Sequence, residues 1–413
     1  MEDMSRVNQA NEDKAEEVRQ ALAQMVCYES VAPSKFCNES DGFKTFIAAC
    51  NPSVLSFLDS TSLQQNCLKL YKQEHSKVME VFSNLDGQIS LSIDLLTYEK
   101  PGEPFHEHMC LSAHFVNDKW KLRKWVLRYC DVYGLEMKPS VVATSESIRD
   151  WNIEGKVFGV TIGGKIDTSM LKEQVQGKRV LLLNGKLFHV RCCSDMISRM
   201  VQKGFRMIDE IIDKVQAIAW SRSLPLWYLT STKLRNALEL KENGGFSRVP
   251  KRFVPTKGEW GKVKKVCKIV DQIYEITKGL FKAKMLTANL FLPCLKEIRT
   301  YLTQEANSSD PFEKSMAEKM LKTFNKYWND MYLILAIAAF LDPRHKMKLI
   351  ELSSSKVGDS DDHNEEKSAY VLQTIHRLYD DYVGPNDQPV NSELNLYLEE
   401  PVLPMTENFS VLL

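Results

Sequence analysis

Asp94 is the carboxylate whose sequence surroundings best suit metal chemistry. It lies in the segment ISLSIDLLT (residues 89–97), where apolar and polar residues alternate in the pattern typical of a β-strand. A carboxylate on a strand can bind a divalent cation, but phosphoryl transfer by two cations needs several such ligands close together. The sequence therefore offers Asp94 as one candidate ligand and requires partners for it.

Two further groups of residues have metal-ligand chemistry. His106, His108 and Cys110 alternate, so on a strand they would share one face. No fourth ligand is evident, and we favour histidines at a strand edge over a zinc site. Cys192 and Cys193 are adjacent, so their side chains point in different directions, which favours core thiols over a shared metal.

A cluster of lysines is the candidate DNA-binding feature. It consists of Lys257, Lys262, Lys264, Lys265 and Lys268. Such a cluster can contact phosphates, but a lysine-rich stretch is more often the solvated face of a helix. Both interpretations stay open at this point.

Composition restricts the class of protein. The 413 residues are 44% hydrophobic, enough for a globular chain, and 54 basic residues balance 54 acidic ones, so no overall positive field favours nucleic acid or an anionic membrane. The ten cysteines are scattered, as expected for reduced thiols in cytosol or nucleus. No secretory signal is evident, and the longest apolar run, residues 331–341, is too short to span a bilayer, so we expect a soluble protein without a membrane partner.

The hydrophobic periodicity predicts an α/β protein. Helical spacing opens the chain, three strands follow with turn residues Asn117 and Asp118 between the last two, and then a helix, a strand and a helix. The predicted ranges are helices 18–26 and 63–82, strands 89–96, 109–116 and 121–130, helix 143–153, strand 157–162 and helix 167–176. This order, with its antiparallel three-strand meander, is that of an RNase-H-like core.

The second half of the sequence is predicted to be helical. Apolar residues recur on one face from Met196 onward, and further helices are expected at 261–281, 286–304 and 311–341. Asp342, Pro343 and Arg344 indicate the end of the last of these helices. Residues 353–366 are rich in Ser, Asp and Glu, which favours an acidic, solvated linker.

Several segments, in order along the chain, resemble plant hAT-family transposases. They are residues 89–97 with Asp94, CLSAHFVNDKWKL (110–122), LFHVRCC (187–193), the stretch from YW at 327–328 to LAIAAFLDPRHKMK (335–348), and SELNLYLEEP (392–401). The resemblance is greatest to the domesticated daysleeper and ricesleeper group. It implies a BED zinc finger, an RNase-H-like core interrupted by a helical insertion domain, a C-terminal dimerisation region, DNA binding and a nuclear location.

The resemblance also implies a domain organisation. We expect an N-terminal helical region at 1–85, the first part of the RNase-H-like core at 86–195, and the helical insertion with the hAT-like RNase-H-fold region at 196–350. Residues 351–413 would form the acidic loop and a linker toward a C-terminal dimerisation segment that this sequence does not include.

The sequence departs from the family at the residues that would bind metal. The family uses Asp, Asp and Glu; Asp94 is the remnant of the first, Gly163 replaces the second, and the third belongs to a segment beyond residue 413. Asp167, four residues after Gly163, is better explained as a helix N-cap than as a displaced ligand. A family histidine is replaced by Asp195. No Cys-x-x-Cys followed by His-x-x-x-His is present, so we expect no BED zinc finger.

These observations predict a non-catalytic, domesticated or degenerate hAT transposase-like protein with no cofactor, its ancestral Mg²⁺ or Mn²⁺ site lost. Its expected location is the nucleus, and its expected partners are weakly bound DNA, other proteins or related full-length family members. Two alternatives stay open: a fragment of an active, metal-dependent transposase or nuclease, and a transposon relic without a function.

Overall fold

The computed structural model describes residues 16–28, 41–50, 59–98, 106–132, 139–163, 167–219, 227–247, 249–251, 253–282, 288–354, 361–383 and 392–404. The chain forms two compact units. The first contains residues 1–86 together with 151–153, and the second contains 87–150 and 154–413. Within the described residues, no helix is both long and apolar enough to cross a membrane.

The first unit is helical. It contains a helix at 16–28, α3 (Asp41–Cys50) and α4 (Ser60–Ser83), which begins after Asp59 because the carboxylate of Asp59 accepts a hydrogen bond from the Ser62 backbone at 2.7 Å. Leu22, Ala23, Val26 and Leu63 form its buried cluster. The helices predicted at 18–26 and 63–82 are confirmed, whereas α3 was not expected.

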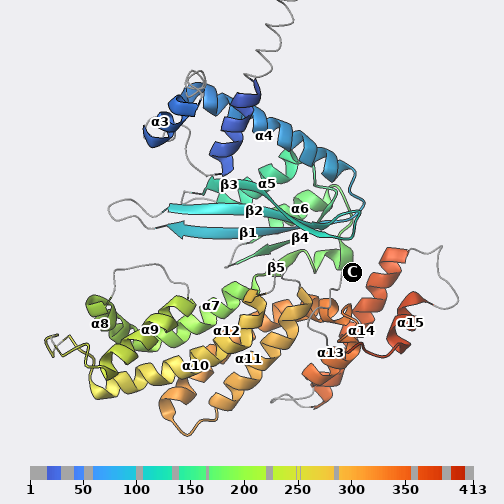
Figure 1. Ribbon diagram of the computed structural model, residues 1–413. Helices are drawn as coiled ribbons and strands as arrows, with labels where there is room; N and C mark the ends of the chain where they lie inside the picture. Colours follow the sequence, from blue (N-terminus) through green and yellow to red (C-terminus); the bar gives the residue numbers. More distant parts are fainter. Residues whose placement is uncertain are drawn as a thin grey trace, which may run out of the picture. The chain divides into compact units, whose positions relative to one another are not determined.

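The second unit is built on a five-stranded sheet. Its strands are β1 (Ile89–Tyr98), β2 (His106–Val116), β3 (Leu122–Asp131), β4 (Val157–Ile162) and β5 (His189–Arg191), in the order β3-β2-β1-β4-β5 (Figure 1). The first three strands are antiparallel, while β4 runs parallel to β1 and β5 parallel to β4. The predicted meander and the RNase-H-like order are confirmed; β5, only three residues long, was not foreseen.

The strand alternation gives the sheet two different faces. Leu91, Ile93, Met109 and Leu111 are buried on one face. The hydroxyl of Thr144, in α5 (Pro139–Asp150), donates to the Met109 sulfur at 3.7 Å, so α5 covers this face. The residues between them in β1, including Asp94, point to the opposite face, where Asp94 is exposed.

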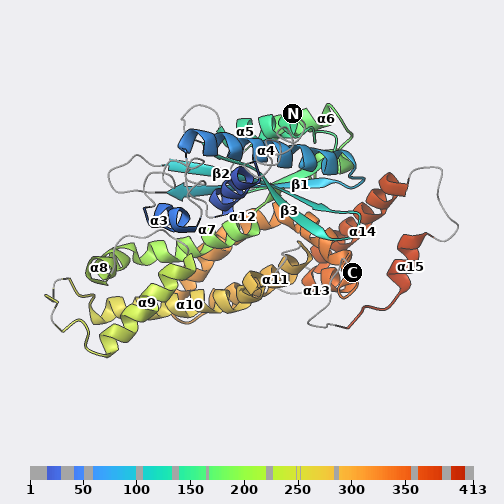
Figure 2. The same cartoon turned by 45° about the horizontal axis from the view of Figure 1, so that its top comes forward.

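The remaining helices share one large apolar core. They are α6 (Ser169–Gln176) beside α5, then α7 (Cys193–Phe205), α8 (Asp209–Ala219), α9 (Trp227–Glu242), α10 (Lys257–Lys282), α11 (Phe291–Glu305), α12 (Pro311–Phe340) and α13 (Lys346–Ser354). Except for α6, each contributes to or packs on a single buried cluster. The long helices α10, α11 and α12 run side by side (Figure 2).

The predicted helix at 311–341 is confirmed, with a physical reason for each end. The carboxylate of Asp310 accepts hydrogen bonds from the backbone of Phe312 and Glu313, both at 3.0 Å, and Pro311 occupies the first turn. The helix ends at Phe340, before Asp342 and Pro343.

The segment after residue 354 differs from the prediction. Helix α14 spans Asp361–Val383 and α15 spans Glu393–Glu399, so the expectation of a loop continuing to residue 366 was wrong. Val371 and Ile375, one helical turn apart, are buried in the large core. The acidic composition of residues 353–366 favoured a loop, but the short apolar stripe that follows is enough to pack the helix against its neighbours.

Candidate functional site around Asp94

The sheet register places Asp94 beside Gly163. Ile93 of β1 pairs with Ile162, the last residue of β4. The next residues of the two segments, Asp94 and Gly163, therefore also lie side by side. On its other side Asp94 pairs with Cys110 of β2. The structure therefore brings together the two positions that the sequence predicted for the first and second carboxylates.

The space next to Gly163 is occupied by another acid, Asp195. A Cβ atom placed on Gly163 would lie 3.2 Å from both Cβ and Cγ of Asp195 and 3.5 Å from its Oδ1. Asp195 belongs to the first turn of α7, and the Cys192 backbone N–H donates to the Ile162 carbonyl at 3.1 Å, which fixes the start of α7 against the end of β4. A carboxylate is therefore present near the second position, but it comes from a helix instead of the strand.

The carboxylate of Asp195 is already neutralised within the chain. Its Oδ2 accepts a hydrogen bond from Arg199 Nε at 2.7 Å, one helical turn along α7. This hydrogen bond raises the pKa of the Arg199 guanidinium. The sequence showed that an acid stands at 195, but only the folded chain places it against Gly163 and Arg199.

Cys192 lies close to both carboxylates. Burial raises the pKa of the Cys192 thiol, hydrogen bonds from the backbone of Asp195 and Ser194 oppose that rise, and the charges of Asp195 and Asp94 add to it. Burial likewise raises the pKa of the Cys193 thiol above the usual range. The expectation of a core thiol is confirmed for Cys193, which is buried, while Cys192 is half-buried.

These residues do not fit a two-metal centre. Mg²⁺ requires near-octahedral oxygen coordination, and two-metal chemistry requires carboxylates that are free to bind. Gly163 supplies no side-chain ligand, and the carboxylate of Asp195 is engaged by Arg199. Within the described ranges, no three His, Cys, Asp or Glu side chains are grouped to hold a metal ion.

Asp167 and the alternating residues of β2 lie in other surroundings. The Asp167 carboxylate accepts a hydrogen bond from the Ser169 backbone at 3.0 Å at the start of α6, as the N-cap interpretation expected, although Thr168 holds the cap position itself. His108 pairs with Asp131 and stacks on Tyr129 with ring centroids 5.5 Å apart. The side chain of His106 lies outside the described residues.

The lysine cluster of α10 is largely paired with acids of other helices. Lys264 contacts Glu242 at 2.9 Å, Lys265 contacts Asp310, and Lys268 lies 3.2 Å from Glu305 and 3.4 Å from Glu313. Lys262 approaches the Phe312 ring, with 6.0 Å from Nζ to the centroid. Lys257 is exposed at the start of α10. Of the five, only Lys257 and Lys262 form no ion pair with a described acid, and DNA binding by this cluster stays a prediction.

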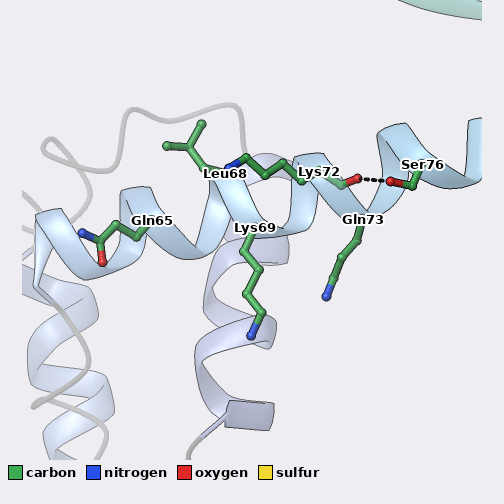
Figure 3. A pocket seen from close by; sticks show the side chains of 6 residues that line it. All are labelled: Gln65, Leu68, Lys69, Lys72, Gln73 and Ser76. Atoms are coloured by element: carbon green, nitrogen blue, oxygen red, sulfur yellow. Dashed lines mark hydrogen bonds between the residues drawn. The ribbon is translucent and has the colours of Figure 1, made fainter. Parts of the chain in front are cut away.

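A hollow of about 540 Å³ on the first unit offers no comparable chemistry. Its lining side chains all come from α4: Gln65, Leu68, Lys69, Lys72, Gln73 and Ser76 (Figure 3). Lys69 is paired with Glu16, and Ser76 donates to the Lys72 carbonyl at 3.0 Å. It is an open surface of one helix without converging polar groups.

The sheet order and the position of Asp94 define an RNase-H-like domain. Consistent with this, residues 289–382 match the family described as hAT-like transposase, RNase-H fold, and residues 104–187 match the ZBED1 RNase-like domain. The first of these matches extends through α14, which sequence reasoning had assigned partly to a linker.

Curated relatives place the chain beside plant transposase-derived proteins. It is 26% identical to the zinc finger BED domain-containing protein DAYSLEEPER of Arabidopsis thaliana, over 97% of this chain and 65% of the relative. It is 27% identical to RICESLEEPER 2 of Oryza sativa subsp. japonica (84% and 52%) and 23% identical to the putative AC transposase of Zea mays (91% and 55%). The chain therefore spans between about half and two thirds of the length of these relatives, and the predicted resemblance to hAT transposase-derived proteins is confirmed.

Proposed function

We propose that this hAT transposase-like chain is not a strand-transfer enzyme and acts in the nucleus as a DNA-binding protein. The proposal joins two statements that are tested separately: the Asp94 site does not activate a nucleophile through divalent cations, and the fold retains affinity for DNA.

The observation that carries the first statement is the arrangement of Gly163, Asp195 and Arg199. The strand position beside Asp94 has no side chain, and the nearby carboxylate is held by a guanidinium at 2.7 Å. A cation bound there would compete with Arg199 for the charge of Asp195 and would gain only two carboxylates, those of Asp94 and Asp195. Electrostatic stabilisation of both the attacking and the leaving oxygen needs more than this site offers.

DNA binding is supported by the relatives and by local charge. Two of the relatives are named as zinc finger BED domain-containing proteins and one as a putative transposase, and a transposase acts on DNA. The chain has no net charge, so contacts must come from local positive side chains such as Lys257 and Lys262. We therefore propose weak, salt-sensitive binding, alone or together with protein partners such as full-length family members.

The test uses the purified chain with hairpin and nicked DNA in titrations of Mg²⁺ and Mn²⁺. We expect electrophoretic shifts that weaken steeply with salt, and no cleavage product. Cleavage that disappears in Asp94→Ala would overturn the non-catalytic proposal. Absence of both cleavage and binding would overturn the DNA-binding statement and favour a relic.

One observation favours a second candidate, part of an active transposase. The Asp94 carboxylate is exposed, so ligands from another chain segment could reach it. The same cleavage assay, repeated after adding a full-length relative, distinguishes the two: stimulation of cleavage by wild type but not by Asp94→Ala supports the transposase.

A further inference from the structure

A second pocket in the larger unit lies away from Asp94 and has a different chemistry. Its volume is about 520 Å³, and three segments far apart in sequence form it: Gln88 before β1, the turn containing Arg179 and Asn184, and the end of α14 with Arg377, Asp381 and Tyr382. Sequence analysis predicted no site here, because α14 was not foreseen.

The turn that forms one wall has an unusual backbone. Leu183, Asn184 and Gly185 are consecutive left-handed residues, with φ of 49°, 55° and 74°. Gly185 is favoured here because its φ is positive, a conformation that residues with a Cβ rarely adopt. Such outliers persist only where the surrounding structure holds them, and they cluster at binding sites.

The turn and α14 also contact each other through residues outside the pocket lining. Lys186, the residue after Gly185, donates to the Tyr370 hydroxyl at 3.4 Å and lies 6.0 Å from the centroid of that ring. Side chains that do not line the pocket therefore connect its two walls.

The pocket contains two arginines that are available to an anion. Arg179 Nε makes a long hydrogen bond of 3.4 Å to the neighbouring Val180 carbonyl, and neither Arg179 nor Arg377 forms an ion pair with a carboxylate in the described part of the chain. Asp381 is the one acid of the lining, so two positive charges face one negative charge. The planar guanidinium group matches the geometry of phosphate oxygens.

The rim adds an aromatic surface and amides. Tyr382 is 79% exposed, whereas a tyrosine that packs in the core would be mostly buried. An exposed aromatic ring beside positive charge is the combination that stacks on a nucleobase while its phosphate is bound. Gln88 and Asn184 supply hydrogen-bonding amides at the opposite wall.

We propose that this pocket binds a nucleotide unit, with its phosphate on Arg179 and Arg377 and its base on Tyr382. The unit is either a free nucleotide or part of a single DNA strand, since both present the same phosphate and base. This site is separate from the Asp94 site and does not require the proposed DNA binding, because a free nucleotide would occupy it equally well.

The experiment measures fluorescence anisotropy of a labelled oligo-dT strand with the full chain, and competition by free dTMP. The Arg179→Ala/Arg377→Ala variant should bind the strand at least about tenfold more weakly and lower the slope of log affinity against log salt by about one to two. Tyr382→Ala should weaken binding by about tenfold, and Tyr382→Phe should restore it because stacking needs only the ring. Arg123→Ala, an exposed arginine on β3, is the matched control.

The outcomes separate the sources and the proposals. Competition by dTMP identifies a free nucleotide as a ligand, whereas strand binding without competition identifies a DNA strand. Equal affinities for the double variant and Arg123→Ala, with unchanged melting temperatures, would overturn the pocket proposal even if the chain binds DNA elsewhere. If the wild-type chain binds dTMP but does not bind duplex DNA, the proposed DNA-binding function is overturned and the pocket proposal is retained.

Discussion

Asn289 donates a hydrogen bond to Asp342 across 2.7 Å in the interior of the larger unit, joining the turn before α11 to the end of α12. Asp342 is fully buried, and its carboxylate also accepts from Arg344 Nε at 2.9 Å, from the other guanidinium nitrogen at 2.6 Å and from the Arg344 backbone at 3.0 Å. Every oxygen of this buried charge is satisfied. The predicted helix stop is therefore also a polar hub of the core.

Removal of this carboxylate should destabilise the protein strongly. Asp342→Ala removes the buried carboxylate that accepts hydrogen bonds from the Arg344 guanidinium and the Asn289 amide, so we expect a loss of about 3–5 kcal/mol in the free energy of unfolding. Urea denaturation followed by circular dichroism measures it. Asp380→Ala, an exposed aspartate on α14, is the control and should change stability by no more than about 0.5 kcal/mol. Similar losses in the two variants would show that the buried Asp342 carboxylate does not stabilise the core.

The same hub predicts a pH dependence. Burial alone would raise the pKa of Asp342, but the hydrogen bonds from Arg344 and Asn289 outweigh it and lower the pKa to about 2. Because the folded pKa lies below the unfolded value of about 4, the stabilisation is complete above that value and is lost as pH falls toward 2. The stability difference between wild type and Asp342→Asn should therefore shrink between about pH 5 and pH 2. A constant difference over this range would contradict the prediction.

A carboxylate restored at position 163 should reveal what the site still lacks. Gly163→Asp places a third negative charge beside Asp94 and Asp195, so its melting temperature should fall below that of the neutral control Gly163→Ser. Mn²⁺ should raise the melting temperature of Gly163→Asp, since binding to the folded state alone stabilises it, and leave wild type unchanged. Stabilisation of wild type by Mn²⁺ would show that the native site already accepts the cation.

Two glycines should respond to alanine in opposite directions. Gly185→Ala meets both a positive φ and the Lys172 side chain, so we expect a loss of more than about 1 kcal/mol. Gly261 lies inside α10 with no atom within 4 Å of an added Cβ, so Gly261→Ala should stabilise by about 0.5–1 kcal/mol. Thermal unfolding compares them directly. Stabilisation by Gly185→Ala would mean that the left-handed turn is absent in solution.

The lysines of α10 can be separated into structural and DNA-contacting groups. Lys257→Ala/Lys262→Ala should weaken DNA binding and reduce its salt dependence with little change in stability, because neither lysine pairs with a described acid. Lys265→Ala/Lys268→Ala removes the contacts to Asp310, Glu305 and Glu313 and should mainly lower the melting temperature. Equal DNA affinities for both double variants and wild type would exclude α10 as the DNA contact.

Much of the framework was predictable from local pattern. The three-strand meander, the strand at 157–162 and the long helix from Pro311 follow from alternation, turn residues and capping, which act over a few neighbouring residues. Strand β5 and helix α14 were missed because a three-residue strand and a charged helix with a narrow apolar stripe carry little local signal. Their positions depend on partners distant in the chain.

The sequence by itself determined that Asp94 stands on a strand and that no second aspartate follows the strand at 157–162. Only the tertiary structure decided what replaces it: Asp195 from α7 lies against Gly163, with Arg199 as its counter-ion. Spacing along a chain cannot reveal this, because the first turn of α7 reaches β4 through the pairing of β5 and the packing of α12 on α7. Residues 163 and 195 become neighbours only when the sheet and that helix pair form together.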